Sequence, residues 1–154
     1  MNKALLSFTL LFVLCMNNLR SQDYQTGVGL RGGFPAAITI KHFVGQNAIE
    51  GLIGSRWGGF SLTGLYEVHK DNAFDVNRLN WYYGIGGHIA FYNGSAGPYA
   101  VSYTAIGVDG ILGIEYNIQE APINISLDYK PALNFGTYFF ARGDEGAISV
   151  RYIF

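Results

Sequence analysis

The feature of this sequence that most constrains its fold is a regular alternation of apolar residues with small or polar ones. It is clearest over residues 105–118, where the even positions are apolar or Gly and the odd positions include Asp109 and Glu115. Successive side chains point to opposite faces of a β-strand, whereas a helix repeats its apolar positions every three or four residues. The alternation therefore predicts β-strands that each have one apolar face.

The alternation recurs along the chain, and no linker or low-complexity stretch interrupts it. With 21 glycines among 154 residues and 16 % aromatic residues, the chain is also poorly suited to a helical bundle. An even number of strands with short connections is typical of bacterial outer-membrane barrels. We therefore predict an all-β fold over residues 22–154, an eight-stranded antiparallel up-and-down transmembrane β-barrel. The predicted strands cover residues 24–33, 37–43, 48–56, 60–69, 81–91, 105–118, 123–135 and 147–154.

The charged residues of these strands all fall on the face opposite the apolar one. A water-soluble barrel would show the reverse pattern, and a charged side chain facing lipid costs about 2–4 kcal/mol at the bilayer midplane. We therefore expect charges inside. Eight strands leave room only for side chains, and buried charges must pair, so we predict that ion pairs and hydrogen bonds close the lumen. The predicted lumen network is Arg31, Lys41, Glu50, Arg56, Glu67, His69, His88, Asp109, Glu115, Asp128, Lys130 and Arg151.

Aromatic residues on the predicted apolar face gather towards the two ends of the strands. Such girdles are expected where aromatic rings meet lipid headgroups. The girdle expected on the periplasmic side comprises Tyr24, Tyr66, Trp81, Tyr116, Tyr152 and Phe154. The girdle expected on the outer side comprises Phe34, Phe60, Phe91 and Phe135.

Residues 1–21 have the layout of a cleaved secretory signal peptide. Lys3 precedes an apolar run over residues 4–16, and residues 17–21 are polar. The run is too short for a membrane-spanning helix, which needs about 20 residues. We expect cleavage after Ser21, which would also remove Cys15, the only cysteine.

Signals for catalysis or cofactor binding are weak. Residues 27–32 fit G-x-G-x-x-G, but no helix is predicted after them, as a dinucleotide site requires. The histidines match no zinc spacing, and no Ser-His-Asp triad can be assembled from the order of the residues. We expect no catalytic residue, no cofactor and no bound metal. A net charge of −1 gives no reason to expect nucleic acid as a partner.

The eight alternating strands, the signal-peptide layout and the end of the last strand resemble small bacterial outer-membrane β-barrel proteins, of the type of the OmpA membrane domain and OmpX. In that family, a last strand that ends in Phe is the signal read by the barrel-assembly machinery. The resemblance implies an outer-membrane location, both termini in the periplasm, and contact with outer-membrane lipid, the assembly machinery and other envelope proteins. The residues that match the assembly signal are Ile148, Val150, Tyr152 and Phe154.

The main hypothesis is a non-enzymatic outer-membrane barrel that is structural or an accessory subunit of an envelope assembly. Its loops at residues 92–104 and 136–145 are expected to face outward from the cell, where they could meet a partner or lipopolysaccharide through Tyr99, Tyr103, Tyr138, Phe139, Phe140 and Arg142. One alternative is a lipid-modifying barrel enzyme that uses His69 and His88. The other is a secreted soluble barrel that binds a small apolar ligand, which would require charges on the outside.

Overall fold

The computed structural model describes residues 25–154 apart from residues 57, 94–100 and 137–138, and it does not describe the side chain of Arg56. The predicted signal peptide lies outside the described residues. Within them, the single helical segment is the 3-10 turn η1 (Ala73–Asp75). No helix in this part of the chain is long and apolar enough to cross a membrane.

Almost all of the described chain is strand or short turn. The strands are β1 (Thr26–Gly33), β2 (Ala36–Val44), β3 (Asn47–Arg56), β4 (Gly59–Lys70), β5 (Leu79–Tyr92), β6 (Tyr103–Asn117), β7 (Ile123–Tyr129), β8 (Ala132–Gly136), β9 (Phe140–Arg142) and β10 (Gly146–Ile153). Over these residues, the prediction of an all-β fold is confirmed.

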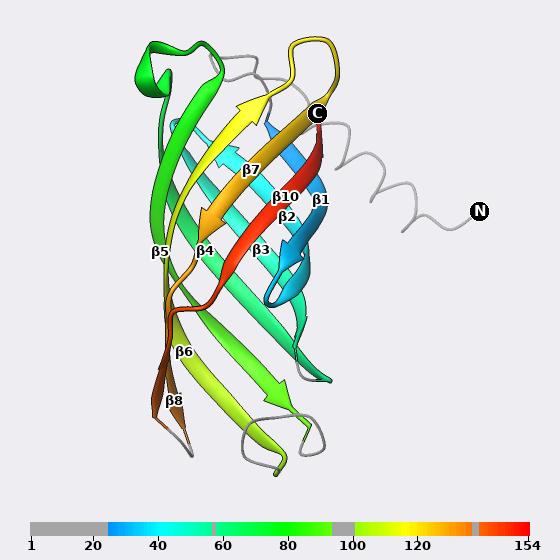
Figure 1. Cartoon of the computed structure of the whole chain (residues 1–154), viewed down its shortest axis with the longest axis vertical. Helices are drawn as coiled ribbons and strands as arrows, with labels where there is room; N and C mark the ends of the chain where they lie inside the picture. The colour runs from blue at the N-terminus through cyan, green and yellow to red at the C-terminus, as the bar shows by residue number, and fades with distance from the viewer. Residues whose placement is uncertain (1–24, 57, 94–100, 137–138) are drawn as a thin grey trace, which may run out of the picture.

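The strands pair antiparallel and close into a barrel (Figure 1). β1 pairs with β2 on one side and with β10 on the other, while β5 pairs with both β4 and β6. β7 and β8 lie one after the other along β6, so together they form one strand of the barrel. β10 pairs with β7, and β9 pairs with β8. The described residues therefore confirm the predicted closed, eight-stranded antiparallel barrel.

Two predicted boundaries are wrong, both in the last third of the chain. Residues 123–135 do not form one strand, because Pro131 lacks the N–H that a continuous ladder needs. The backbone stays paired around this break: the Lys130 N–H donates to the Glu145 carbonyl over 2.8 Å, and the Gly110 N–H donates to the Pro131 carbonyl over 2.9 Å. Residues 136–145, predicted as an external loop, contain β9 and turn back against the barrel.

The barrel has two ends, which we name by the chain terminus. The C terminus lies at the end drawn uppermost in Figure 1, together with the β2–β3, β4–β5 and β6–β7 turns, and we call this end the C-terminal rim. At the opposite end, which we call the far rim, β1, β3, β5 and β8 end and β2, β4, β6 and β9 begin. β5 and β6 are the longest strands and reach the far rim well beyond β1 and β10.

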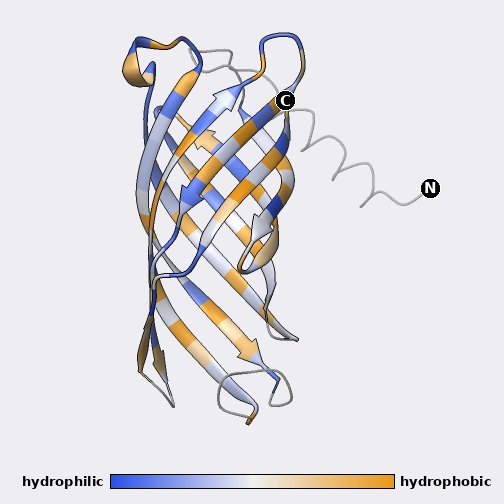
Figure 2. Ribbon diagram, in the orientation of Figure 1, coloured by the Kyte–Doolittle hydropathy of each residue, from blue (hydrophilic) through white to orange (hydrophobic). Residues whose placement is uncertain are grey.

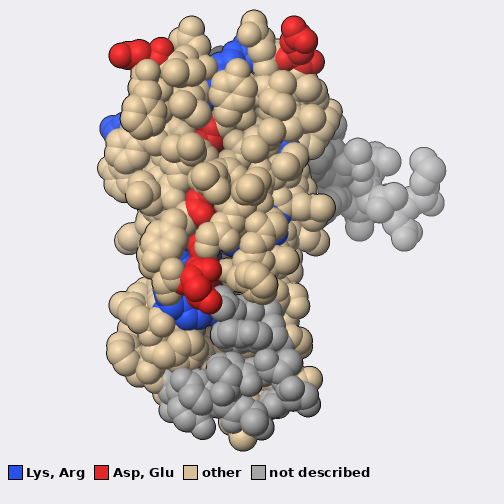
Figure 3. Space-filling view, in the orientation of Figure 1, with Lys and Arg blue, Asp and Glu red and all other residues tan. Residues whose placement is uncertain are grey.

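The outer surface of the barrel is apolar. Leu30 is 68 % exposed, Ile85 74 % and Ile148 57 %, and Figure 2 shows apolar and polar residues alternating along the strands. Among the described strand residues, Lys70 at the end of β4 is the only exposed Asp, Glu, Lys or Arg. The face seen in Figure 3 is accordingly mostly uncharged: charged atoms show at its upper end, as scattered spots over its middle and edges, and in a narrow group lower down.

The aromatic residues of both predicted girdles are exposed wherever the structure describes them; Tyr24 lies outside the described residues. Near the C-terminal rim, Trp81 stacks on Tyr83 with ring centroids 5.4 Å apart. Near the far rim, Phe60 on β4 lies opposite Phe91 on β5. The register of the strands thus separates the two aromatic sets along the barrel.

Candidate functional site

The charged residues of the strands lie inside the barrel. Every predicted lumen residue whose side chain is described is at most 7 % exposed. These are Arg31, Lys41, Glu50, Glu67, His69, His88, Asp109, Glu115, Asp128, Lys130 and Arg151, whereas the side chain of Arg56 lies outside the described part. They fall into two clusters and one separate ion pair.

The first cluster lies in the half of the barrel near the C-terminal rim, and we call it the inner cluster. Its members come from β2, β3, β4, β6 and β10, and they are Lys41, Glu50, Glu67, His69, Glu115 and Arg151. Lys41 lies at its centre, with Nζ 2.8 Å from Glu67 Oε2, 3.5 Å from Glu115 Oε2 and 3.8 Å from Glu50 Oε2. One ammonium group is therefore shared among three carboxylates.

Arg151 connects the inner cluster to β7, the strand paired with its own β10. Its Nη2 lies 2.5 Å from Glu50 Oε1. Its Nη1 donates to Asn124 Oδ1 over 3.1 Å and to Ser126 Oγ over 2.8 Å. Its Nε donates to Thr39 Oγ1 over 3.0 Å, and the Thr39 hydroxyl donates in turn to Glu50. The guanidinium thus joins side chains from β2, β3 and β7, which favours a rigid interior.

His69 occupies the edge of the inner cluster, between carboxylates and aromatic rings. Its Nε2 lies 3.1 Å from Glu67 Oε2, and its Nδ1 lies 3.4 Å from Glu115 Oε1. The imidazole stacks on the Tyr82 ring with centroids 4.9 Å apart. Lys41 Nζ lies 4.0 Å from the centroid of the same Tyr82 ring, so this tyrosine packs against both a histidine and a cation.

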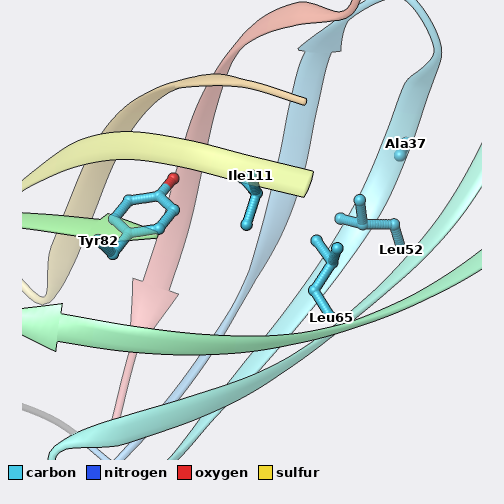
Figure 4. Packing of buried hydrophobic residues seen from close by; sticks show 5 residues of the cluster. All are labelled: Ala37, Leu52, Leu65, Tyr82 and Ile111. Atoms are coloured by element: carbon cyan, nitrogen blue, oxygen red, sulfur yellow. The ribbon is translucent and has the colours of Figure 1, made fainter. Parts of the chain in front are cut away.

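Apolar side chains separate the inner cluster from the far half of the lumen. Ala37, Leu52, Leu65, Tyr82 and Ile111 form one buried group, and Figure 4 shows them reaching into the barrel from their separate strands. Along β6, Ile111 lies between Glu115 of the inner cluster and Asp109 of the far half. The separate ion pair, Arg31 Nη2 to Asp128 Oδ1 at 2.5 Å, joins β1 to β7.

The second cluster lies in the half near the far rim, and we call it the outer cluster. It comprises His88, Asp109, Lys130, Arg142 and Glu145. Lys130 Nζ lies 2.6 Å from both Asp109 Oδ1 and Glu145 Oε2, and Arg142 Nε lies 3.1 Å from Glu145 Oε1. His88 Nδ1 lies 2.8 Å from Asp109 Oδ2, and His88 Nε2 lies 3.0 Å from Asn134 Oδ1. Two carboxylates here face two cations.

Arg142 and Glu145 are the functional residues that sequence reasoning missed. The prediction that Arg142 is exposed on an external loop is wrong, since its side chain is buried and its Nη1 donates to the Tyr92 hydroxyl over 2.6 Å. Tyr103 is buried as well, against Tyr92. Glu145 could have been predicted from the sequence. The inward-facing residues of the last strand occupy odd positions, and position 145 extends this series by one step towards the N terminus.

The other residues that were predicted on the external loops differ in their exposure. Phe139 is 71 % exposed, as predicted, while Phe140 packs partly buried against the group of Ala90, Tyr92, Tyr103 and Ala105. Tyr99 and Tyr138 lie outside the described residues.

The arrangement neutralises charge and fills the barrel interior. Each cluster draws side chains from several strands, so it cross-links the wall from within and blocks the lumen. Within the described residues, no group of three or more His, Cys, Asp or Glu side chains is arranged to hold a metal ion. Comparisons with models of known protein families, with curated proteins and with solved structures give no match.

Proposed function

We propose that this protein is a non-enzymatic integral β-barrel of the bacterial outer membrane that serves as a structural or accessory subunit of an envelope assembly. The observation that carries the proposal is the partition of charge: the outward strand face is apolar, and the ionic groups face the lumen. Burying that apolar face in hydrocarbon is favourable, whereas in water it would be an aggregation hazard. A closed barrel also satisfies its backbone hydrogen bonds internally, as a lipid-facing structure must.

The lumen supports a structural role rather than a pore. Side chains of the inner cluster, the apolar group and the outer cluster follow one another along the interior. An eight-stranded barrel has room for side chains only. We therefore propose that the protein conducts no ions in its resting state, and that its function lies at its surface with lipid and other envelope proteins.

The environment of the two histidines supports a non-enzymatic role. In the described structure, both ring nitrogens of His69 face carboxylates, and both ring nitrogens of His88 face side-chain oxygens. A general base needs a ring nitrogen within reach of its substrate. A lipid-modifying enzyme remains the second hypothesis; if it holds, replacing His69 and His88 together by Ala abolishes a lipid A change, and unaltered lipid A in a deletion strain removes it.

The last strand supports assembly as an outer-membrane protein with both termini in the periplasm. β10 pairs with β1 and so closes the barrel, and the Phe154 N–H donates to the Thr26 carbonyl over 2.9 Å. Tyr152 and Phe154 are 60 % and 54 % exposed on the outward face. Both aromatic side chains are therefore presented to whatever inserts this strand, which we propose is the barrel-assembly machinery.

Cell fractionation followed by electrophoresis tests the proposal. We expect the protein in the outer-membrane fraction, extractable only with detergent, with a band that migrates faster when the sample is left unheated. A known soluble periplasmic protein, treated in parallel, is the control for leakage between fractions. Recovery of a monodisperse, detergent-free protein from the periplasm would overturn the proposal and favour the soluble ligand-binding barrel.

A further inference from the structure

With its three glutamates ionised and His69 neutral, the inner cluster would hold one more negative than positive charge. In the described residues it holds three carboxylates, of Glu50, Glu67 and Glu115, against the cations of Lys41 and Arg151. All five side chains are at most 1 % exposed. A buried charge without a partner is costly. One further positive charge at this place would balance the cluster.

The geometry around His69 indicates where that charge is. Its two ring nitrogens face Glu67 Oε2 at 3.1 Å and Glu115 Oε1 at 3.4 Å. An ionised carboxylate can only accept hydrogen bonds, and a neutral imidazole has only one N–H to donate. Only the imidazolium form presents an N–H to both carboxylates at once.

We infer that His69 is a proton-binding site of the barrel interior, carrying an imidazolium that donates to Glu67 on β4, faces Glu115 on β6 with its second N–H and so completes the charge balance of the inner cluster. The titratable and charged groups that face this site from the surrounding strands are Lys41, Glu50, Glu67, Tyr82, Glu115 and Arg151. The protonation state of His69 does not depend on the proposed outer-membrane location, because all these groups belong to the interior of the barrel.

His88 provides an internal comparison. It also has an oxygen beside each ring nitrogen, Asp109 Oδ2 and the amide oxygen of Asn134, whose Nδ2 donates to the Phe140 carbonyl. The outer cluster is already balanced, with Asp109 and Glu145 against Lys130 and Arg142. The charge balance of the outer cluster therefore does not depend on His88, whereas that of the inner cluster depends on His69.

Nitrogen-15 NMR of the imidazole rings in the intact, micelle-embedded barrel measures the protonation state of each histidine. At about pH 8 a free histidine is neutral and gives two unequal nitrogen shifts. We expect His69 to give two similar shifts, each with an attached proton. A neutral His69 at that pH would overturn the inference and leave the balancing proton on one of the cluster's carboxyl groups instead.

Charge-balanced variants provide the second test. His69→Gln removes the cation, and we expect the folding equilibrium constant to fall about 100-fold, because Glu67 and Glu115 are left with one fewer buried positive partner. Adding Glu115→Gln restores the balance and should recover most of that loss. The matched control, His88→Gln, should gain nothing from Glu115→Gln. A double variant as unstable as the two single variants combined would contradict the inference.

Discussion

Arg151 on the last strand lies with its Nη2 2.5 Å from Oε1 of Glu50 on β3, although 101 positions separate the two residues in sequence. The pair is fully buried, and Thr39, Asn124 and Ser126 hold the remaining guanidinium donors. It links β10, the strand that closes the barrel, to β3, from which β1 and β2 separate it in the sheet. The pair can therefore form only once the ring of strands is closed.

Replacing Arg151 by Leu should lower the free energy of unfolding by about 3–5 kcal/mol, because Glu50 is left as a buried charge with one fewer partner. Urea unfolding of the barrel in lipid vesicles measures the loss. The double variant Arg151→Leu/Glu50→Leu should lose less than Arg151→Leu alone. As a control, Val150→Ile on the outward face should leave the stability unchanged. Equal losses in the single and double variants would mean that the pair is not the source of the effect.

A charge on the outward face should be costly if that face meets hydrocarbon. Leu127 is 54 % exposed on β7 and lies between Ile114 and Ile148 on the neighbouring strands. Leu127→Arg should lower the free energy of unfolding in vesicles by about 2–4 kcal/mol if the residue is near the midplane, and by less near an interface. Leu127→Phe is the control and should have little effect. An arginine variant that unfolds like the wild type would argue against a lipid-facing β7.

Gly113 makes room for the Tyr82 ring inside the barrel. A Cβ at this position would lie 2.5 Å from Tyr82 Cζ and 2.9 Å from the Leu127 carbonyl oxygen. Gly113→Ala should therefore cost about 1–3 kcal/mol in the free energy of unfolding. In a Tyr82→Leu background the same change should cost less, although the contact with Leu127 remains. Gly51→Ala, where a Cβ would meet nothing within 4 Å, is the matched control; an equal loss at both glycines would refute the steric explanation.

The side chain of Phe154 should matter for assembly in cells more than for the stability of the folded barrel. Its backbone pairs with Thr26, and a substitution keeps those hydrogen bonds. Phe154→Ala should thus lower the amount of folded protein in the outer membrane while leaving refolding into synthetic vesicles nearly unchanged. Phe34→Ala, which removes an exposed aromatic side chain at the far rim, is the control. Normal outer-membrane levels of the Phe154 variant would exclude a role for this residue as an assembly signal.

The period-two pattern was enough to predict the strands and their two faces, because the side chains of a strand alternate regardless of which strands become its neighbours. On that basis Asp109, Glu115 and Asp128 could be assigned to the interior before any partner was known. The pattern was least informative where the backbone departs from a regular strand. The Pro131 break and the return of residues 140–145 brought Arg142 inside, although sequence reasoning had placed it on an outer loop.

The choice of ionic partners was decided by tertiary structure alone. Lys41 faces three carboxylates from three different strands, and Arg31 faces Asp128, which lies 97 positions away. Such contacts depend on strand register and on how the sheet closes, and a shift of one residue in any strand would turn its charged side chains towards the outside. The sequence by itself determined which residues face inward, while only ring closure determined which of them meet, because inward direction is a local property of a strand and contact across the lumen is not.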